Sequence, residues 1–215
     1  MIVTIKLEAR SLELEATMNN MKISIIKYNA GNIRSVAFAL ERLGVDFEIT
    51  DDAEKIKSAD KVIFPGVGEA SSTMNYLREK KLDQLIINLK QPVLGICLGM
   101  QLMCKYSEEN NTSCLGIFDE EVKKFIPDHH HKVPHMGWNS LQLNSGWLNT
   151  ELQDQFVYFV HSYFVPVNAF TSATTNYITP FSAAMRRNNF FAVQFHPEKS
   201  SKSGKMVLES FLKNS

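Results

Sequence analysis

The chain has 215 residues, enough for one large domain or two small ones, and enough to bury a core without disulfides or metal. Hydrophobic residues make up 44% and charged residues 21%, a composition too apolar for a disordered protein. Lys plus Arg and Asp plus Glu both number 23, so the zero net charge gives no bulk attraction to nucleic acid or an anionic membrane.

Membrane and secretory signals are not expected. No apolar run approaches the roughly 20 residues that span a bilayer, and residues 1–8 lack a basic segment followed by an apolar one. The three cysteines, Cys97, Cys104 and Cys114, cannot all pair and form no disulfide framework. We therefore expect a soluble cytoplasmic protein of the α/β class.

Residues 1–20 differ from the rest of the chain because apolar and polar residues alternate in them. This alternation indicates an extended hairpin or an edge strand. An extension that is not native to the protein fits equally well, since Met21 begins a cleaner pattern. We leave both interpretations open and expect the functional domain to cover residues 21–215.

From Met21 onward, strand-like and helix-like segments alternate, which predicts βαβ units and a mainly parallel open sheet flanked by helices. The expected strands of the first half cover residues 22–27, 45–49, 61–64 and 92–96, and the expected helices cover residues 33–43, a stretch ending at Leu77, and 81–89. The second half adds strands at 157–160, 172–178 and 190–195 and a last helix at 204–212. Chemistry in such sheets sits beyond the carboxyl ends of the strands, which places the loops at Gly66 and Cys97 in the candidate site.

The most informative motif is the run Gly-Ile-Cys-Leu-Gly-Met-Gln at residues 95–101. It has the spacing of a nucleophile elbow with Cys97 as the nucleophile, and its glycines leave room for neighbouring backbone. The sulfur would lie at a helix N-terminus, which favours the thiolate, and the Leu98 N–H would face the oxyanion of a tetrahedral intermediate. A buried structural cysteine is the alternative, and it is our interpretation of Cys104 and Cys114.

A cysteine nucleophile needs a base and a group that orients the base. His196 and Glu198 lie two residues apart after the strand at 190–195, and residues i and i+2 of an extended segment share a face. His-Pro-Glu alone is equally compatible with a surface turn. Together with the elbow, it predicts a Cys–His–Glu triad of Cys97, His196 and Glu198.

The run Pro-Gly-Val-Gly at residues 65–68 has neither the third glycine of a dinucleotide site nor the Lys-Ser/Thr of a phosphate loop, and no cofactor is expected. Gly66 and Gly68 would let the Val67 peptide turn and offer a second oxyanion donor, although a plain βα turn is nearly as good an interpretation. The three consecutive histidines at 129–131 lack metal-ligand spacing, so we interpret them as a solvated loop and expect no metal.

These motifs, in this order, resemble the class I (triad-type) glutamine amidotransferases, which release ammonia from glutamine through a γ-glutamyl thioester. The resemblance is greatest to the glutaminase subunits of imidazole glycerol phosphate synthases. It runs from Met21 to the end and includes residues 31–36, 132–139 and 158–163. It implies a flavodoxin-like architecture with extra strands in the C-terminal half.

The resemblance also implies roles for individual residues. Cys97 would be the nucleophile, His196 the base and then the acid, and Glu198 the orienting group, with the Val67 and Leu98 backbones as the oxyanion hole. The residues implied in glutamine binding are Gly66, Gly68, Gln101, His161, Ser162 and Tyr163. Pro134, Met136 and Trp138 would face a (β/α)₈ cyclase subunit, the heterodimer partner that receives the ammonia and forms imidazole glycerol phosphate and AICAR in histidine biosynthesis.

Some residues depart from the family pattern, and other functions stay open. Asn29 and Ser201 stand where glycine is commoner, and residues 1–20 have no counterpart. The alternatives are a glutaminase subunit of another class I complex, a stand-alone cysteine hydrolase of similar fold, and a non-catalytic binding module. Residues 133–139 argue against the first alternative, and intact Cys97, His196 and Glu198 argue against the last.

Overall fold

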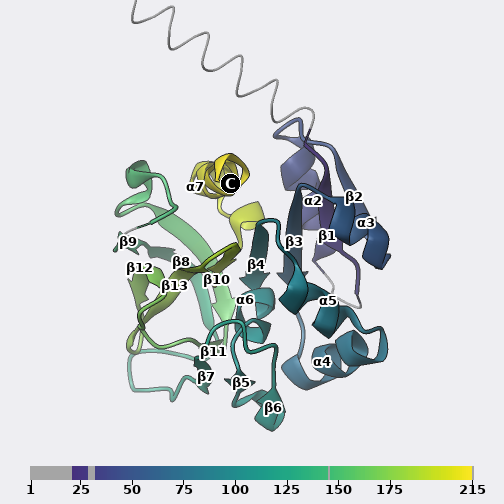
Figure 1. The fold of residues 1–215 in the computed structure, drawn as a ribbon. Helices are drawn as coiled ribbons and strands as arrows, with labels where there is room; N and C mark the ends of the chain where they lie inside the picture. Colours follow the sequence, from purple (N-terminus) through teal and green to yellow (C-terminus); the bar gives the residue numbers. More distant parts are fainter. Residues whose placement is uncertain (1–20, 29–31, 145, 215) are drawn as a thin grey trace, which may run out of the picture.

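The computed structural model describes residues 21–28, 32–144 and 146–214. The predictions for residues 1–20 and for Asn29 lie outside these ranges. Among the described residues, eight strands form one sheet in the order β2-β1-β3-β4-β14-β13-β12-β9 (Figure 1). The bounds are β1 (Ile23–Ile26), β2 (Phe47–Thr50), β3 (Lys61–Gly66), β4 (Val93–Cys97), β9 (Gln142–Leu143), β12 (Thr171–Asn176), β13 (Pro180–Arg187) and β14 (Phe190–Val193).

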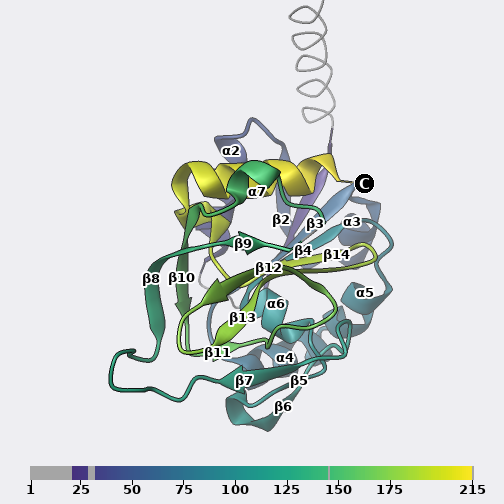
Figure 2. The same ribbon diagram turned by 90° about the vertical axis from the view of Figure 1, so that its left-hand side faces the viewer.

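The five strands from β2 to β14 are parallel, and β13, β12 and β9 join by antiparallel pairing. The prediction of a mainly parallel sheet flanked by helices is therefore confirmed. The helices are α2 (Ile33–Glu41), α3 (Ala53–Ser58), α4 (Ala70–Glu79), α5 (Leu82–Asn88), α6 (Leu98–Leu102) and α7 (Ser201–Lys213). Helix α2 packs with α7 on one face of the sheet, and α3 to α6 cover the other (Figures 1 and 2).

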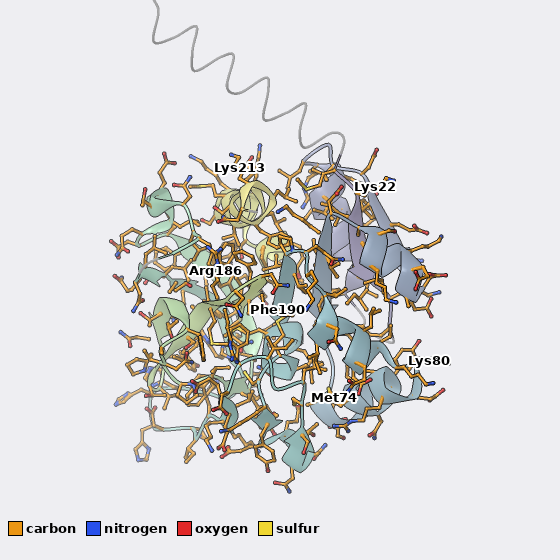
Figure 3. All side chains as sticks on the ribbon, in the orientation of Figure 1. Lys22, Met74, Lys80, Arg186, Phe190 and Lys213 are labelled. Carbon is orange, nitrogen blue, oxygen red and sulfur yellow. The ribbon has the colours of Figure 1, made fainter. Side chains whose placement is uncertain are left out.

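The central strands are apolar along their whole length because helices cover both faces of the sheet, so that both faces of each strand are buried. In β3, Ile63 packs into the core on the α2 and α7 side, whereas Val62 and Phe64 pack into the core under α3 to α6. Figure 3 shows the resulting division: Met74 lies inside, and the charged ends of Lys22 and Lys80 point outward.

Several predicted boundaries are wrong by a few residues. The strand expected at 45–49 is β2 at 47–50, and the helix expected to run to residue 43 ends at Glu41. The last helix begins at Ser201 rather than Gly204. Gly204 lies inside α7, and a Cβ there would overlap the carbonyl oxygen of Pro197. The glycine therefore allows the helix to pack closely against the preceding turn.

Smaller sheets extend the second half of the described chain. Strand β8 (His135–Ser140) pairs antiparallel with β10 (Phe156–His161), and β11 (Tyr163–Phe164), β7 (Glu121–Lys124), β5 (Tyr106–Ser107) and β6 (Thr112–Ser113) form another sheet. Short 3₁₀ turns lie at Glu109–Asn111, Thr150–Leu152 and Pro197–Lys199. Across the ranges described here, every helix is too short or too polar to traverse a lipid bilayer.

Candidate active site

A sharp strand-to-helix turn carries Cys97. Strand β4 ends at Cys97 and α6 begins at Leu98, with the Cys97 backbone at φ 53°, a strained conformation that costs a non-glycine residue roughly 1–3 kcal/mol. The flanking glycines permit this turn. A Cβ on Gly95 would lie 2.8 Å from the Met103 sulfur, and a Cβ on Gly99 would overlap the Phe64 carbonyl oxygen.

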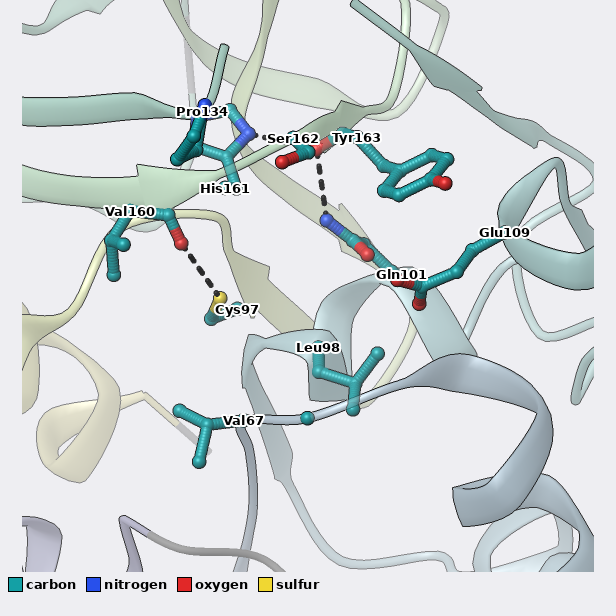
Figure 4. A pocket seen from close by; sticks show the side chains of 11 residues that line it. Val67, Cys97, Leu98, Gln101, Glu109, Pro134, Val160, His161, Ser162 and Tyr163 are labelled. Carbon is teal, nitrogen blue, oxygen red and sulfur yellow. Dashed lines mark hydrogen bonds between the residues drawn. The ribbon is translucent and has the colours of Figure 1, made fainter.

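Buried polar contacts surround the Cys97 sulfur, which belongs to a residue only 7% exposed. Gln194 donates from Nε2 to Cys97 Sγ at 3.7 Å, and Sγ lies 3.9 Å from the Val160 carbonyl oxygen (Figure 4). Gln194 follows β14, the strand that pairs directly with β4. The sheet order therefore brings the predicted nucleophile beside the C-terminal segment that holds the predicted base.

His196 and Glu198 form a buried pair on that segment. His196 Nδ1 lies 2.7 Å from Glu198 Oε1, and the two side chains are 1% and 0% exposed. The Asn32 side-chain amide donates to the same Glu198 oxygen. Because a carboxylate accepts hydrogen bonds, Nδ1 carries the proton in this contact, which leaves Nε2 to exchange a proton with another group.

The electrostatics of His196 connect it to Cys97. Burial on its own lowers the pKa of His196, but the nearby Cys97 and the Glu198 carboxylate more than offset burial and raise the pKa to about 10. A protonated histidine beside a cysteine favours the thiolate form, in which the cysteine is nucleophilic.

A pocket of about 330 Å³ opens above Cys97 (Figure 4). Its lining comes from the elbow, the loop after β3, the turn between β5 and β6, the residue before β8, and the segment from the end of β10 to the start of β11. These residues are Val67, Gly68, Cys97, Leu98, Gln101, Glu109, Pro134, Val160, His161, Ser162 and Tyr163. Figure 4 shows Val67 and Leu98 on one side of Cys97 and the 160–163 segment on the other.

Most of the predicted substrate-binding residues meet in this pocket. Gln101 is held in place because its Nε2 donates to the Tyr163 carbonyl oxygen at 2.9 Å and to Gln194 Oε1 at 3.0 Å. Gly66 is different, since it is buried away from the pocket lining. A Cβ on Gly66 would lie 2.7 Å from the Gly99 nitrogen and 2.8 Å from the Leu98 Cβ, so this glycine serves the contact between β3 and α6.

Sequence reasoning missed several residues of the site. Glu109 lines the pocket, and burial raises its pKa, helped by Glu69 and opposed by a hydrogen bond from the Ala70 N–H. Nothing in the sequence around Glu109 distinguishes it from the neighbouring polar residues. Gln194 did carry a signal, because it is a polar residue inside an apolar strand run, and it is fully buried.

The residues predicted to face a partner lie around strand β8. Met136 is 63% exposed and Trp138 is 52% exposed, and Phe156 on the paired strand β10 is 56% exposed. Trp138 packs edge-on against Tyr158 with ring centroids 6.0 Å apart. Pro134 is exposed as well and also lines the pocket, so it lies between this apolar surface and the site.

Comparison with known proteins gives consistent matches along the chain. The family model described as glutamine amidotransferase class-I matches residues 19–214. The imidazole glycerol phosphate synthase subunit HisH of Bacteroides fragilis (strain YCH46) is 61% identical over 194 residues, covering 89% of this chain and 99% of the relative. The HisH subunit of Pasteurella multocida is 49% identical, covering 89% and 98%.

Solved structures agree in fold. The crystal structure of a glutamine amidotransferase superposes with a TM-score of 0.69 at 17% identity, covering 89% of this chain and 97% of the other. PurLQS from Thermotoga maritima gives 0.64 at 15% identity, with the same coverage. On the family model and the identity to HisH subunits, the chain belongs to the class-I glutamine amidotransferase family, and within that family to the HisH group of enzymes.

Proposed function

We propose that this chain is the glutaminase subunit of an imidazole glycerol phosphate synthase in histidine biosynthesis. It releases ammonia from glutamine through a thioester on Cys97 and passes the ammonia to a (β/α)₈ cyclase subunit. The observation that carries the proposal is the strained Cys97 beside the buried His196–Glu198 pair, at the base of a pocket large enough for an amino acid.

In the first half-reaction, the Cys97 thiolate attacks the side-chain carbonyl carbon of glutamine. The carbonyl oxygen becomes an oxyanion, which the Leu98 N–H at the start of α6 and the Val67 peptide stabilise. The C–N bond then breaks while His196 Nε2 gives its proton to the departing nitrogen, which leaves as ammonia. A γ-glutamyl thioester remains on Cys97.

In the second half-reaction, the neutral His196 takes a proton from water, and the resulting hydroxide attacks the thioester carbonyl. The C–S bond breaks, glutamate leaves, and the thiolate–imidazolium pair is restored. Glu198 holds the ring with Nδ1–H directed at its carboxylate through both halves, so that Nε2 always faces the reaction.

Glutamine recognition would use the opposite end of the pocket. Glu109 supplies a carboxylate that suits the substrate α-ammonium group, and Gln101 together with the Ser162–Tyr163 backbone supplies polar groups at the wall. With its α-ammonium group at Glu109, glutamine would extend its side-chain amide toward Cys97.

The ammonia needs a protected route, because protonation in bulk water removes its nucleophilicity. The exposed apolar side chains of β8 and β10, Met136, Trp138 and Phe156, offer a surface for the cyclase in a heterodimer, with Pro134 at the junction. The cyclase would use the ammonia to form imidazole glycerol phosphate and AICAR.

The experiment compares Cys97→Ala with Cys114→Ala in the complex with the cyclase. Cys114 is a half-buried cysteine outside the pocket and serves as the matched control. We expect Cys97→Ala to abolish glutamine-dependent product formation while ammonia-dependent formation persists, and Cys114→Ala to retain both. Loss of both activities in Cys97→Ala would assign Cys97 a structural role and contradict the proposal.

A further inference from the structure

Two buried histidines have no part in the mechanism above: His161, which lines the pocket, and His135, which contacts His161. His135 begins β8 and His161 ends β10, and the antiparallel register pairs them directly. They are 3% and 6% exposed. A buried histidine needs hydrogen-bond partners for both ring nitrogens, so the contacts of these two rings show which nitrogen of each ring carries the proton.

The contacts allow one consistent assignment of the ring protons. His161 Nδ1 lies 2.7 Å from the Tyr163 carbonyl oxygen, so it must carry the proton. His161 Nε2 is then an acceptor, and it lies 3.0 Å from His135 Nδ1, which must be the donor. His135 Nε2 in turn accepts from the Asn139 side-chain amide at 3.4 Å. We call Asn139, His135, His161 and the Tyr163 carbonyl the histidine relay.

Both rings of the relay are held in the neutral form and in a fixed orientation. Burial lowers the pKa of His135 to about 4 and that of His161 to about 3. The His135 ring is stacked between Tyr177 and Phe159, with centroid distances of 4.0 and 4.8 Å. This sandwich leaves the ring little freedom to turn away from His161.

The relay ends on the wall of the substrate pocket. The Tyr163 carbonyl accepts a second hydrogen bond, from Gln101 Nε2, and both residues line the pocket. Gln101 also donates to Gln194, which donates to the Cys97 sulfur. A continuous set of hydrogen bonds therefore runs from β8, beside the exposed Trp138, to the pocket wall.

We propose that His135 and His161 are positioning residues for glutamine, which act through the Tyr163 carbonyl to hold the Ser162–Tyr163 wall and Gln101 in the conformation that binds substrate. The inference rests on the proposed function. The relay contacts the binding wall and leaves the His196–Glu198 pair untouched, so its loss weakens glutamine binding more than it slows the chemical steps.

The test compares His135→Phe with His135→Asn in the assembled complex with the cyclase. Phenylalanine keeps the stacking between Tyr177 and Phe159 but leaves His161 Nε2 without its donor. Asparagine places an amide nitrogen near the position of Nδ1 and restores that donor. We expect His135→Phe to raise the KM for glutamine about tenfold with kcat within about twofold of wild type, and His135→Asn to keep KM within about threefold.

An unchanged KM in folded His135→Phe, or an effect confined to kcat, would overturn the proposal. A merely structural role predicts equal losses of stability and no difference in KM between the two variants. If His135→Phe does not fold, the pair His161→Leu and His161→Asn applies the same comparison, because only asparagine can still donate to the Tyr163 carbonyl.

A measurement without turnover separates this proposal from the proposed function. In the full chain with ¹⁵N-labelled histidine at pH 7.5, the nitrogen shifts should show both rings neutral with the proton on Nδ1. A proton on Nε2 of His161, or a cationic ring, would contradict the relay. A complex that hydrolyses no glutamine, with this spectrum intact, would instead count against the proposed function alone.

Discussion

The carbonyl oxygen of Phe64 occupies the space that a side chain on Gly99 would need. Phe64 belongs to β3 and Gly99 to α6, so this contact sets how closely the end of β3 approaches the elbow. The same approach brings Gly66 into register with Cys97. The loop that carries Val67 therefore leaves the sheet directly beside the nucleophile.

Adding one methyl group at Gly99 should disrupt the elbow. In Gly99→Ala the Cβ meets backbone rather than a flexible side chain, and we expect a loss of roughly 1–3 kcal/mol in the free energy of unfolding, together with loss of glutaminase activity. Gly44→Ala is the control, since its Cβ meets nothing within 4 Å and only the left-handed φ of 68° is strained. Urea titration and a glutaminase assay of both variants decide the matter, and a fully active Gly99→Ala would refute the close approach.

Glu198→Gln tests the orienting carboxylate. Glutamine has nearly the same size, but it removes the charge that helps to raise the pKa of His196 and no longer fixes the proton on Nδ1. By analogy with triads in which the acid becomes an amide, we expect kcat to fall about 10³–10⁴-fold. Glu209→Gln is the control, because Glu209 is a partly exposed residue of α7 that pairs with Lys205 and does not line the pocket, and it should change kcat by less than twofold. The steady-state kinetics of the complex provide the measurement, and a fall of less than tenfold for Glu198→Gln would remove Glu198 from the triad.

Partner binding should activate the glutaminase. Val67 is half-buried and Gly68 has φ 123° with nothing within 4 Å of a Cβ position, so the segment has room to turn its peptide toward Cys97. One oxyanion donor contributes roughly 10²–10³-fold in rate, and we expect the cyclase to raise kcat by that factor. Equal rates for the isolated chain and the complex would show that the oxyanion hole needs no rearrangement.

The stability of the chain should fall in mild acid because of His161. Its ring contacts His135 and the Tyr163 carbonyl. Burial, opposed by the Tyr163 hydrogen bond and helped by the charges of His135 and His196, lowers the pKa of His161 to about 3. The unfolded chain binds a proton near pH 6.5, so the stabilisation is complete above pH 6.5 and is lost as the pH falls toward 3. Between pH 7.5 and 5 the loss is about 2 kcal/mol for this one ring.

Urea unfolding of the wild type and of His161→Asn at pH 7.5, 6 and 5 measures this loss. The variant should lose less stability on acidification than the wild type. His135, whose pKa is also lowered, adds to the loss that remains, and His196, whose pKa is raised, opposes it. Parallel pH dependences for the two proteins would show that His161 does not titrate in this way.

The parallel strands of the core, the elbow at Cys97 and the His196–Glu198 pair could be predicted from the sequence. The strands and side chains that surround them could not. Residues 61–64 and 92–96 are predictable as strands because burial on both faces leaves an unbroken apolar run. Strand β8 was not predicted, because its sequence mixes histidine, glycine and tryptophan without a clear alternation of apolar and polar residues. Its pairing with β10 is what makes it a strand. The function of Gly66 in packing was also missed, since a glycine pattern does not say which distant backbone approaches it.

The strand order has a consequence for how the protein is made. Strand β14 follows every other strand of its sheet in the chain, yet it inserts between β4 and β13 and brings Gln194 and His196 to the elbow. While the ribosome still holds that segment, the sheet has a gap at its centre and the sulfur has no imidazole beside it. The catalytic pair is therefore complete only after β14 has joined the sheet beside β4.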